Sequence, residues 1–340
     1  LSTLAVNGIA AIKPFPTGFD GAALYMNTTQ LIVEYNGLTE GGQAYFWQLL
    51  LSLGEVLFGK AVFSIGIAHF SFLLVLLAAF RLARLLLNRS WSWLAVWLVA
   101  LNPSLSFHYL YDEKVDLGFT FITLAAALML IEFWTRAARP DAQYESPVKL
   151  PFGLSATQWM LLLTGWLLGF AFGIKYTGLL SIVAIFTVIG YRFGNYWLAM
   201  SLVTGFSGVL FLFGGNNFGY FPFGETAPYV VGLIGIGAAV ALLVPAWMKG
   251  VNLKSLLMAY LLSGGAALLC FAPWGIRNMA ANGEVGVQAL LEAPFPTPVI
   301  KVQAQALEVD YPERLMENIK KRTAGLDIQL SDVQLEQISN

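Results

Sequence analysis

The sequence contains almost no cysteine and few charged residues, and both shortages limit the class of protein to which the chain can belong. Cys270 is the single cysteine, which excludes an internal disulfide and a cysteine metal cluster and leaves it as an expected small core residue. Charged residues make up 11% of the chain, against about 25% in an ordinary soluble domain. Hydrophobic residues reach 57%, and they gather in blocks of about twenty. The chain is therefore predicted to be an all-α, polytopic helical membrane protein.

No excess of either charge is present, and no processing signal is visible. The net charge is -1, and the 19 basic residues are spread along the chain as flanks of apolar blocks, which argues against a nucleic-acid partner. The chain opens at Leu1 without methionine and stops in polar sequence at Asn340. We therefore expect it to be part of a longer protein.

Eight apolar blocks are candidate membrane spans. The fourth and fifth are short for a bilayer core of about 30 Å. One helix made of both would be about 51 Å long, which requires an extreme tilt for a single crossing. We therefore predict about eight transmembrane helices. The blocks cover approximately residues 61–82, 91–110, 115–135, 158–174, 177–192, 195–213, 229–248 and 255–273.

The basic residues support this count. With eight crossings, one face receives Arg81, Arg84, Arg89, Arg136, Arg139, Lys149, Arg192, Lys249 and Lys254. That face is expected to be cytoplasmic, because short cytoplasmic loops carry an excess of Lys and Arg. A merged fourth and fifth span would move the last three of these residues to the opposite face. The outer face then holds residues 1–60, the loop 108–116, the turn at Lys175, the loop 214–228 and everything after Trp274.

This topology divides the chain into three parts. Residues 1–60 form an outer-face first loop that bears amphipathic juxtamembrane helices, residues 61–273 the transmembrane domain, and residues 274–340 an outer-face polar segment, helical or flexible. Within the first loop, GQAYFWQLLLSLGEVLFGK combines aromatics, leucines and the isolated Glu55, which is typical of a helix lying in the interface. Glu55 either lies on the wet face of that helix or orients an acceptor or a metal.

A lysine interrupts the stretch GFAFGIKYTGLL. At the centre of a bilayer Lys175 would cost about 2.5–3.5 kcal/mol, but the turn between two short spans lets its ammonium reach water at the outer face. Lys175 is therefore either a snorkelling residue or a functional cation. Gly165, Gly169 and Gly173, at a spacing of four, predict a small-residue face along which another helix packs closely.

Acidic residues cluster in the outer loop HYLYDEKVDLGFTF. Asp112 and Asp116 share a face if this segment is helical, and carboxylates at a helix start also complement its dipole. Together with His108 they are candidates for orienting an acceptor or a metal, although no recognised metal-ligand spacing is present. The simpler interpretation is a solvated helix start. His69, in the outer third of the first span, is expected to be a hydrogen-bonded interior residue.

Two further motifs belong to the outer face. FPTGFDGAALY places Asp20 after a turn marked by proline and glycine, where an aspartate is commonly an N-cap. CFAPWGIRNM contains Pro273, which is expected to stop the last helix. Trp274 and Arg277 follow it and, taken alone, are ordinary interface anchors.

The order and spacing of four motifs resemble the GT-C superfamily of membrane glycosyltransferases, in particular the branch with protein O-mannosyltransferases and the bacterial aminoarabinose lipid A transferase. The motifs are FPTGFDGAALY, YDEKVDLGFTF, GWLLGFAFGIKYTGLL and PWGIRN, and the resemblance covers nearly all of residues 14–282. Gly21 follows Asp20 where some members carry a second acid. The C-terminal soluble domain and further spans of many members are absent or cut short.

The resemblance implies a hexosyl- or pentosyltransferase that moves a sugar from a polyprenyl-phosphate donor to a hydroxyl of a lipid, glycan or protein. It implies Asp20 and Asp116 as catalytic residues, with Lys175 and Arg277 assigned to the donor phosphate. The site would face the periplasm or exterior of a bacterial inner membrane, among membrane lipids. No cofactor is certain, although a divalent metal is compatible with the acidic loop.

The absence of a glycine-rich phosphate loop also fits a lipid-linked donor better than a nucleotide sugar. The alternative function is a lipid or small-solute transporter or flippase, which would use the same glycine-rich broken helices and intramembrane charges. The lack of an internal repeat and the position of the acids in outer loops favour the enzyme.

Overall fold

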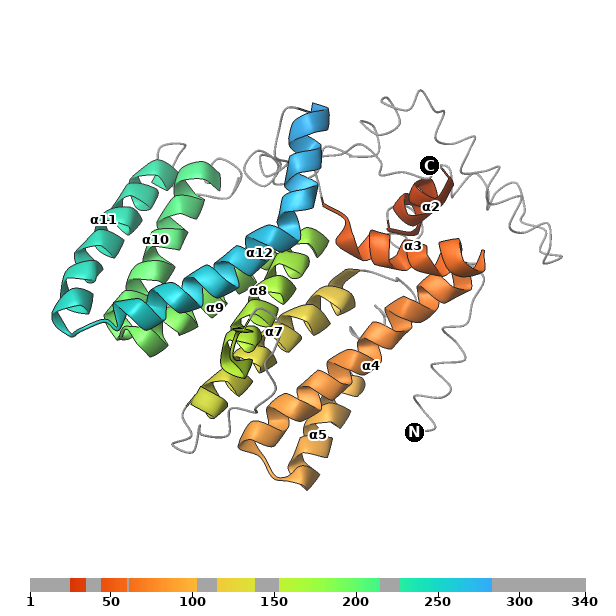
Figure 1. Cartoon of the computed structure of the whole chain (residues 1–340), viewed down its shortest axis with the longest axis horizontal. Coiled ribbons are helices and arrows are strands. Elements are labelled where there is room, and N and C mark those ends of the chain that lie inside the picture. The colour runs from red at the N-terminus through yellow and green to blue at the C-terminus, as the bar shows by residue number, and fades with distance from the viewer. Residues whose placement is uncertain are drawn as a thin grey trace. The chain divides into compact units, whose positions relative to one another are not determined.

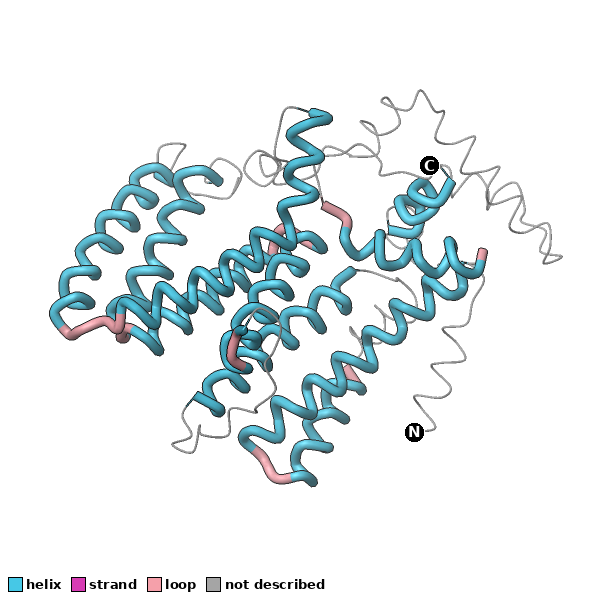
Figure 2. The backbone as a smooth tube through the Cα atoms, in the orientation of Figure 1, coloured by secondary structure: helices cyan, strands magenta, loops and turns pink. Residues whose placement is uncertain are grey.

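The structure is a computed structural model that describes residues 25–34, 44–59, 61–102, 115–137, 153–214 and 227–282. The chain divides into two compact units, residues 1–38 with 42–294 and residues 39–41 with 295–340, and every described residue belongs to the first. All regular elements in the described ranges are helices, which confirms the all-α prediction (Figures 1 and 2). They are α2 (Met26–Glu34), α3 (Phe46–Phe58), α4 (Ala61–Leu86), α5 (Arg89–Ala100), α7 (Val115–Ala137), α8 (Ala156–Ile174), α9 (Gly178–Phe193), α10 (Tyr196–Gly214), α11 (Ala227–Met248) and α12 (Leu253–Asn282).

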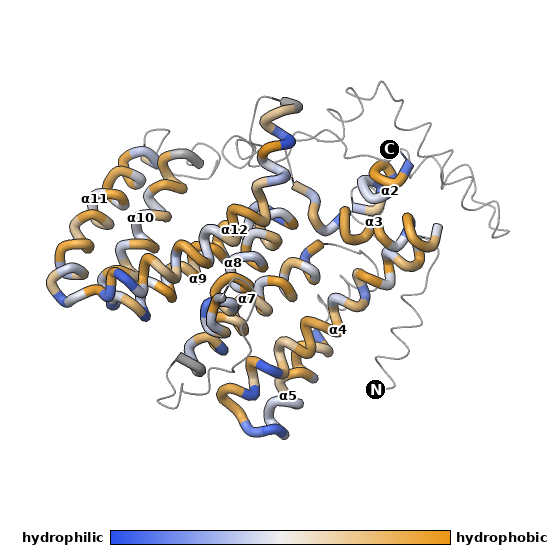
Figure 3. Tube along the Cα trace, in the orientation of Figure 1, coloured by the Kyte–Doolittle hydropathy of each residue, from blue (hydrophilic) through white to orange (hydrophobic). Residues whose placement is uncertain are grey.

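Five of the described helices are long and apolar enough to cross a membrane. They are Val62–Leu86, Val115–Thr135, Ala156–Ile174, Ala227–Met248 and Leu253–Ala280, and they coincide with five of the eight predicted spans. Figure 3 shows the apolar residues running along these helices, with hydrophilic residues at the α4–α5 and α11–α12 turns. The chain is therefore a helical membrane protein.

The other three predicted spans correspond to helices that are not among these five. The fifth and sixth match the apolar helices Gly178–Phe193 and Tyr196–Leu212. The second was placed at residues 91–110, but α5 has 12 residues and ends at Ala100. A helix of that length is about 18 Å long, which is too short for a hydrocarbon core of about 30 Å. Helix α5 is therefore too short to cross a membrane by itself, and residues 103–110 of the predicted span lie outside the described residues.

Helix α8 carries the small-residue face that the glycine spacing predicts. A Cβ on Gly165 would clash with the carbonyl oxygen of Ser263 in α12, and one on Gly169 with the carbonyl oxygen of Ala267. Gly173, in contrast, lies against the ring of Phe46 in α3. The glycines thus allow α8 to approach two different helices, because no side chain separates the backbones.

Helix α3 lies across the ends of three longer helices. Gly54 lies against the start of α4, where a Cβ would be 2.5 Å from the backbone nitrogen of Ser64, and the hydroxyl of Ser64 donates to the Leu51 carbonyl at 2.7 Å. The ring of Trp47 covers Gly118 near the start of α7. A separate helix before the first span is therefore confirmed, while its position in the membrane interface stays a prediction.

The basic helix ends lie away from α3. Helix α4 begins beside α3, so Arg81 and Arg84 mark its far end. Arg192 lies in the last turn of α9, which begins directly after the Lys175 turn. Asn252, at the start of α12, donates its backbone N–H to the Phe193 carbonyl at 2.8 Å. These directions agree with the predicted segregation of charge, and the assignment of that face to the cytoplasm stays a prediction.

Helix α12 continues through Pro273, which was predicted to stop it. The helix has 30 residues and ends at Asn282, with Pro273 inside. Figure 1 shows that its C-terminal part changes direction. An interior proline removes one backbone hydrogen bond and kinks a helix, and the helix can resume beyond it when other contacts hold the next turn. Trp274 and Arg277 are therefore helical residues, and the predicted domain boundary at residue 273 falls inside α12.

Candidate functional site

The described members of the predicted site meet where α7 begins and α8 ends. We call this region the Lys175 end of the bundle. It consists of the first turns of α3 and α7, the turn at residues 175–177, and residues 274–278 of α12. Contacts between Trp47 and Gly118, between Phe46 and Gly173, and between Phe46 and Trp274 join these parts.

Lys175 and Asp116 form an ion pair at this end. The Lys175 ammonium donates a hydrogen bond of 2.8 Å to Oδ1 of Asp116, 59 positions earlier in the chain. The side chains are 42% and 35% exposed, respectively, so both reach solvent. Asp116 lies in the first turn of α7 and Lys175 is the C-cap of α8, so each charge also complements a helix dipole. The sequence placed both residues on one face but did not predict that they bind each other.

The turn after α8 fixes the position of Lys175. Its backbone is extended, with φ -152° and ψ 133°, and its N–H donates to the Ala171 carbonyl. The Lys175 carbonyl in turn accepts the Gly178 N–H at 2.8 Å. Position 178 requires glycine, because a Cβ there would be 2.7 Å from the backbone nitrogen of Phe172. The predicted tight connection between two short helices is therefore confirmed.

Tyr176 adds a neutral phenol to the same turn. Burial raises its pKa to about 12, although a hydrogen bond with the Ala44 backbone acts in the opposite direction. Its ring lies 5.4 Å from that of Phe172, and the side chain packs against the cluster that contains Trp274. At neutral pH Tyr176 therefore contributes hydrogen bonding rather than negative charge.

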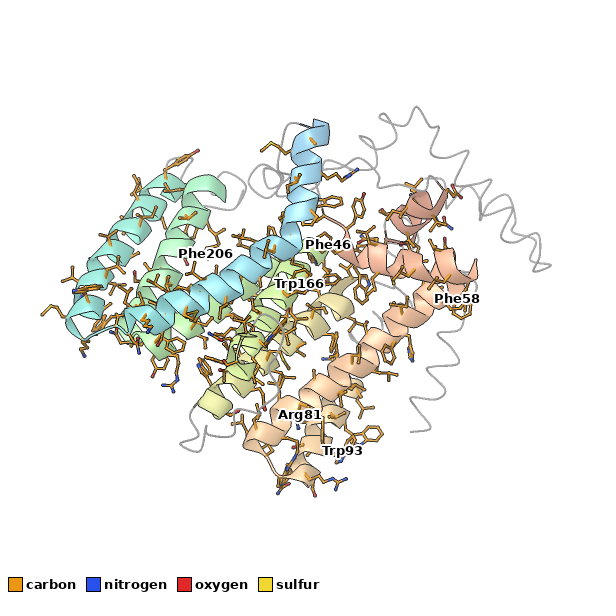
Figure 4. All side chains as sticks on the ribbon, viewed as in Figure 1. Phe46, Phe58, Arg81, Trp93, Trp166 and Phe206 are labelled. Carbon is orange, nitrogen blue, oxygen red and sulfur yellow. The ribbon has the colours of Figure 1, made fainter. Side chains whose placement is uncertain are left out.

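Arg277 lies over an aromatic platform on α12. Its guanidinium carbon is 5.1 Å from the Trp274 ring centroid, the geometry of a cation–π contact. Its Nη1 donates to Oδ1 of Asn278 at 3.4 Å. Trp274 is itself buried and meets the ring of Tyr45 edge-on at 4.5 Å. Figure 4 shows the side chain of the neighbouring Phe46 at the place where α3 approaches α12. The guanidinium is thus positioned by Trp274 and Asn278 of its own helix, and Trp274 in turn packs against α3 and the residue before it.

Four buried polar atoms of this region have no hydrogen-bond partner. They are Nε1 of Trp47, Oε1 of Gln48, Nε1 of Trp274 and Nδ2 of Asn278. Buried polar groups are nearly always hydrogen-bonded, so this grouping on α3 and α12 is unusual. Gln48 and Asn278 are not among the site residues predicted from the sequence. The sequence offers one signal for them: Gln48 directly follows an aromatic residue in YFWQ, and Asn278 directly follows a cation in IRN. Such pairs are common on the polar side of any helix, so they do not identify a functional residue.

Glu55 differs from its simpler interpretation. A position on the wet face of an interfacial helix was one of its two predicted alternatives, but its side chain is buried, with 8% exposure. A role in orienting an acceptor or a metal stays a prediction for Glu55.

The remaining predicted site residues lie outside the described residues. These are Asp20, His108 and Asp112. Within the described ranges, no group of three His, Cys, Asp or Glu side chains is placed to hold a metal ion. A divalent metal therefore stays a prediction that depends on the first and second outer loops.

Comparison with known proteins gives one structural similarity. No family model matches the chain, and no curated protein matches it. The structure is similar to the apo form of an oligosaccharyltransferase from Archaeoglobus fulgidus, with a TM-score of 0.42 and 11% sequence identity, over 99% of this chain and 53% of that one. The chain thus spans about half the length of that protein.

Proposed function

We propose that the protein is a membrane glycosyltransferase that transfers a sugar, hexose or pentose, from a polyprenyl-phosphate donor to an acceptor hydroxyl at the outer membrane face. The observation that supports it most directly is the Lys175–Asp116 ion pair, 2.8 Å long and half-exposed. It places a cation and a carboxylate together at one end of a membrane helix bundle. These are the two kinds of charge that glycosyl transfer from a phosphate requires.

The reaction needs both charges for different steps. The acceptor oxygen attacks the anomeric carbon, the bond from that carbon to the phosphate oxygen breaks, and the bonding electrons leave with the polyprenyl phosphate. A carboxylate takes the acceptor proton. A nearby cation offsets the charge that develops on the departing phosphate. In the proposal Asp20 is the base, Asp116 orients the acceptor or the base, and Lys175 binds the donor phosphate.

Lys175 can bind a phosphate without losing Asp116. An ammonium has three N–H donors, and the hydrogen bond to Asp116 uses one of them. The side chain is 42% exposed, so an incoming phosphate can approach it. In this arrangement the ammonium bridges the carboxylate and the phosphate, and Asp116 sets the direction in which Lys175 points.

Arg277 is the second proposed phosphate ligand. The Trp274 ring holds one face of its guanidinium, and Asn278 accepts one of its N–H groups. A guanidinium can bind two oxygens of a phosphate group through parallel N–H groups. The unpartnered Nδ2 of the fully buried Asn278 adds a neutral donor beside it.

A transfer assay tests the proposal. A purified sample would be given a radiolabelled polyprenyl-phosphate sugar in detergent or liposomes, and the acceptor classes, a lipid, a glycan or a protein, compared. Lys175→Ala should weaken donor binding, and Lys175→Arg should recover part of it because the charge is retained. Asp20→Asn should bind the donor and fail to transfer, because an amide keeps the shape and loses the base.

The matched control is Lys254→Ala, which removes an exposed lysine at the start of α12, at the basic end of the bundle. It should leave donor affinity unchanged. Unchanged affinity in well-folded Lys175→Ala would refute the phosphate role. Movement of unmodified lipid across the bilayer without any sugar transfer would refute the enzyme and point to a transporter.

A further inference from the structure

Three arginines surround the α4–α5 turn, far from the Lys175 end. Arg81 and Arg84 lie in the last turns of α4, and Arg89 is the first residue of α5. All three are exposed. Arg84 caps the turn, since its Nη1 donates to the Leu87 carbonyl at 3.1 Å. The sequence has no acidic residue between positions 56 and 111, and the described residues give these arginines no ion-pair partner. The turn is therefore a concentrated positive surface.

Tryptophans and leucines continue this surface along α5. Trp91 and Trp97 are 59% and 43% exposed, and Leu94 and Leu98 expose 44% and 68%. The opposite side of α5 packs on α4, where Val96 joins the cluster of Phe72 and Leu76. Figure 4 shows Arg81 and Trp93 at the same end of the α4–α5 pair. Helix α5 thus carries an apolar strip that its own fold leaves uncovered.

The length of α5 places this strip at a shallow depth. From Arg89 to Trp97 the helix rises about 12 Å, so the tryptophans stay near the basic turn rather than at mid-bilayer. Trp side chains favour the membrane–water interface. Clusters of Lys and Arg at the cytoplasmic surface favour anionic lipids.

We propose that the α4–α5 turn binds an anionic phospholipid, with the headgroup phosphate at Arg81, Arg84 and Arg89 and an acyl chain along Trp91, Leu94 and Leu98. This inference is independent of the proposed enzymatic activity. Guanidinium groups pair with phosphate through two parallel hydrogen bonds. A phospholipid is favoured over a soluble acidic protein because the same surface joins the charges to an apolar strip, as a lipid joins a headgroup to a chain.

Lipid retention measures the site directly. The purified protein would be equilibrated with phosphatidylglycerol and phosphatidylcholine, and bound lipid counted by native mass spectrometry. The triple variant Arg81→Gln, Arg84→Gln, Arg89→Gln should lose the preference for phosphatidylglycerol by at least about tenfold, since each basic residue near an anionic surface contributes several-fold. Arg84 also caps the turn, so the triple variant could misfold. The double variant Arg81→Gln, Arg89→Gln retains Arg84 and keeps the test valid in that case. This double variant should lose part of the preference for phosphatidylglycerol.

The matched control removes three other exposed basic residues, Arg192 of α9, Lys249 of the α11–α12 connection and Lys254 at the start of α12. It should keep the preference. Equal loss in both triple variants would show general surface charge and overturn the proposal, as would no loss in either. Soluble glycerol phosphate should compete poorly, because it lacks the chain. Full competition at similar concentration, or binding of an acidic protein without lipid, would also overturn the lipid assignment.

Discussion

Breaking the Lys175–Asp116 pair offers a quantitative test of the site. The design is a double-mutant cycle with Asp116→Asn, Lys175→Gln and the combined variant. The bond is short, 2.8 Å, but the side chains are 42% and 35% exposed, so solvent screens the attraction strongly. Exposed pairs are worth at most about 1 kcal/mol, and a half-exposed one should lie near that value. We therefore expect a coupling energy of about 1 kcal/mol at low salt.

Each single variant should cost more than this coupling. Asp116 lies at the start of α7 and Lys175 at the end of α8, where each charge gains about 0.3–1 kcal/mol from the helix dipole. Exchanging the residues, Asp116→Lys with Lys175→Asp, would restore the attraction and reverse both dipole terms. The exchanged protein should therefore be less stable than the wild type by about 1–4 kcal/mol, with little or no transfer activity.

Unfolding in detergent, followed by helical circular dichroism against increasing denaturant, gives the free energies. The cycle would be repeated at high salt, where the coupling should fall because the Debye length shrinks from about 10 Å at 0.1 M to about 3 Å at 1 M. A coupling indistinguishable from zero at low salt would show that the pair is not formed in the membrane protein. An exchanged variant as stable as the wild type would show that the dipoles contribute nothing.

Three other features can be tested separately. Gly165→Ala should lower the free energy of unfolding by about 1–3 kcal/mol, because the new Cβ would overlap a backbone carbonyl of α12. Its control is Gly265→Ala, whose Cβ would meet open space, and this variant should be neutral or slightly stabilising in the same unfolding assay. A cysteine at Thr17 should react with an impermeant thiol reagent outside intact cells and one at Gln143 should not; the reverse labelling would overturn the predicted topology. Tyr176 should ionise only near pH 12, because burial raises its pKa, so the stability from its neutral phenol is present below pH 10 and lost as the pH rises toward 12. In a spectrophotometric titration, Tyr176→Phe should reduce the amplitude of the transition near pH 12 by one tyrosine.

Much of the fold follows from properties of short stretches of sequence. Apolar blocks of about twenty residues have one stable form in a bilayer, because every backbone polar group must be satisfied within the helix. The spacing of Gly165 and Gly169 therefore predicted a close helix contact before its partner was known. Lys175 was placed at a turn for the same local reason, since a lysine avoids the bilayer centre.

The sequence by itself thus determined the class of protein, most of the long helices and the face on which the charged residues gather. Tertiary structure decided the contacts: that Lys175 binds Asp116, 59 positions away, that Glu55 is buried, and that Asn278 accepts a hydrogen bond from Arg277 while its own amide nitrogen has no partner. It also decided that α12 continues past Pro273. Hydropathy and spacing act along a contiguous segment, whereas a contact between distant residues depends on which helices pack together and at what register, and no single segment carries that information.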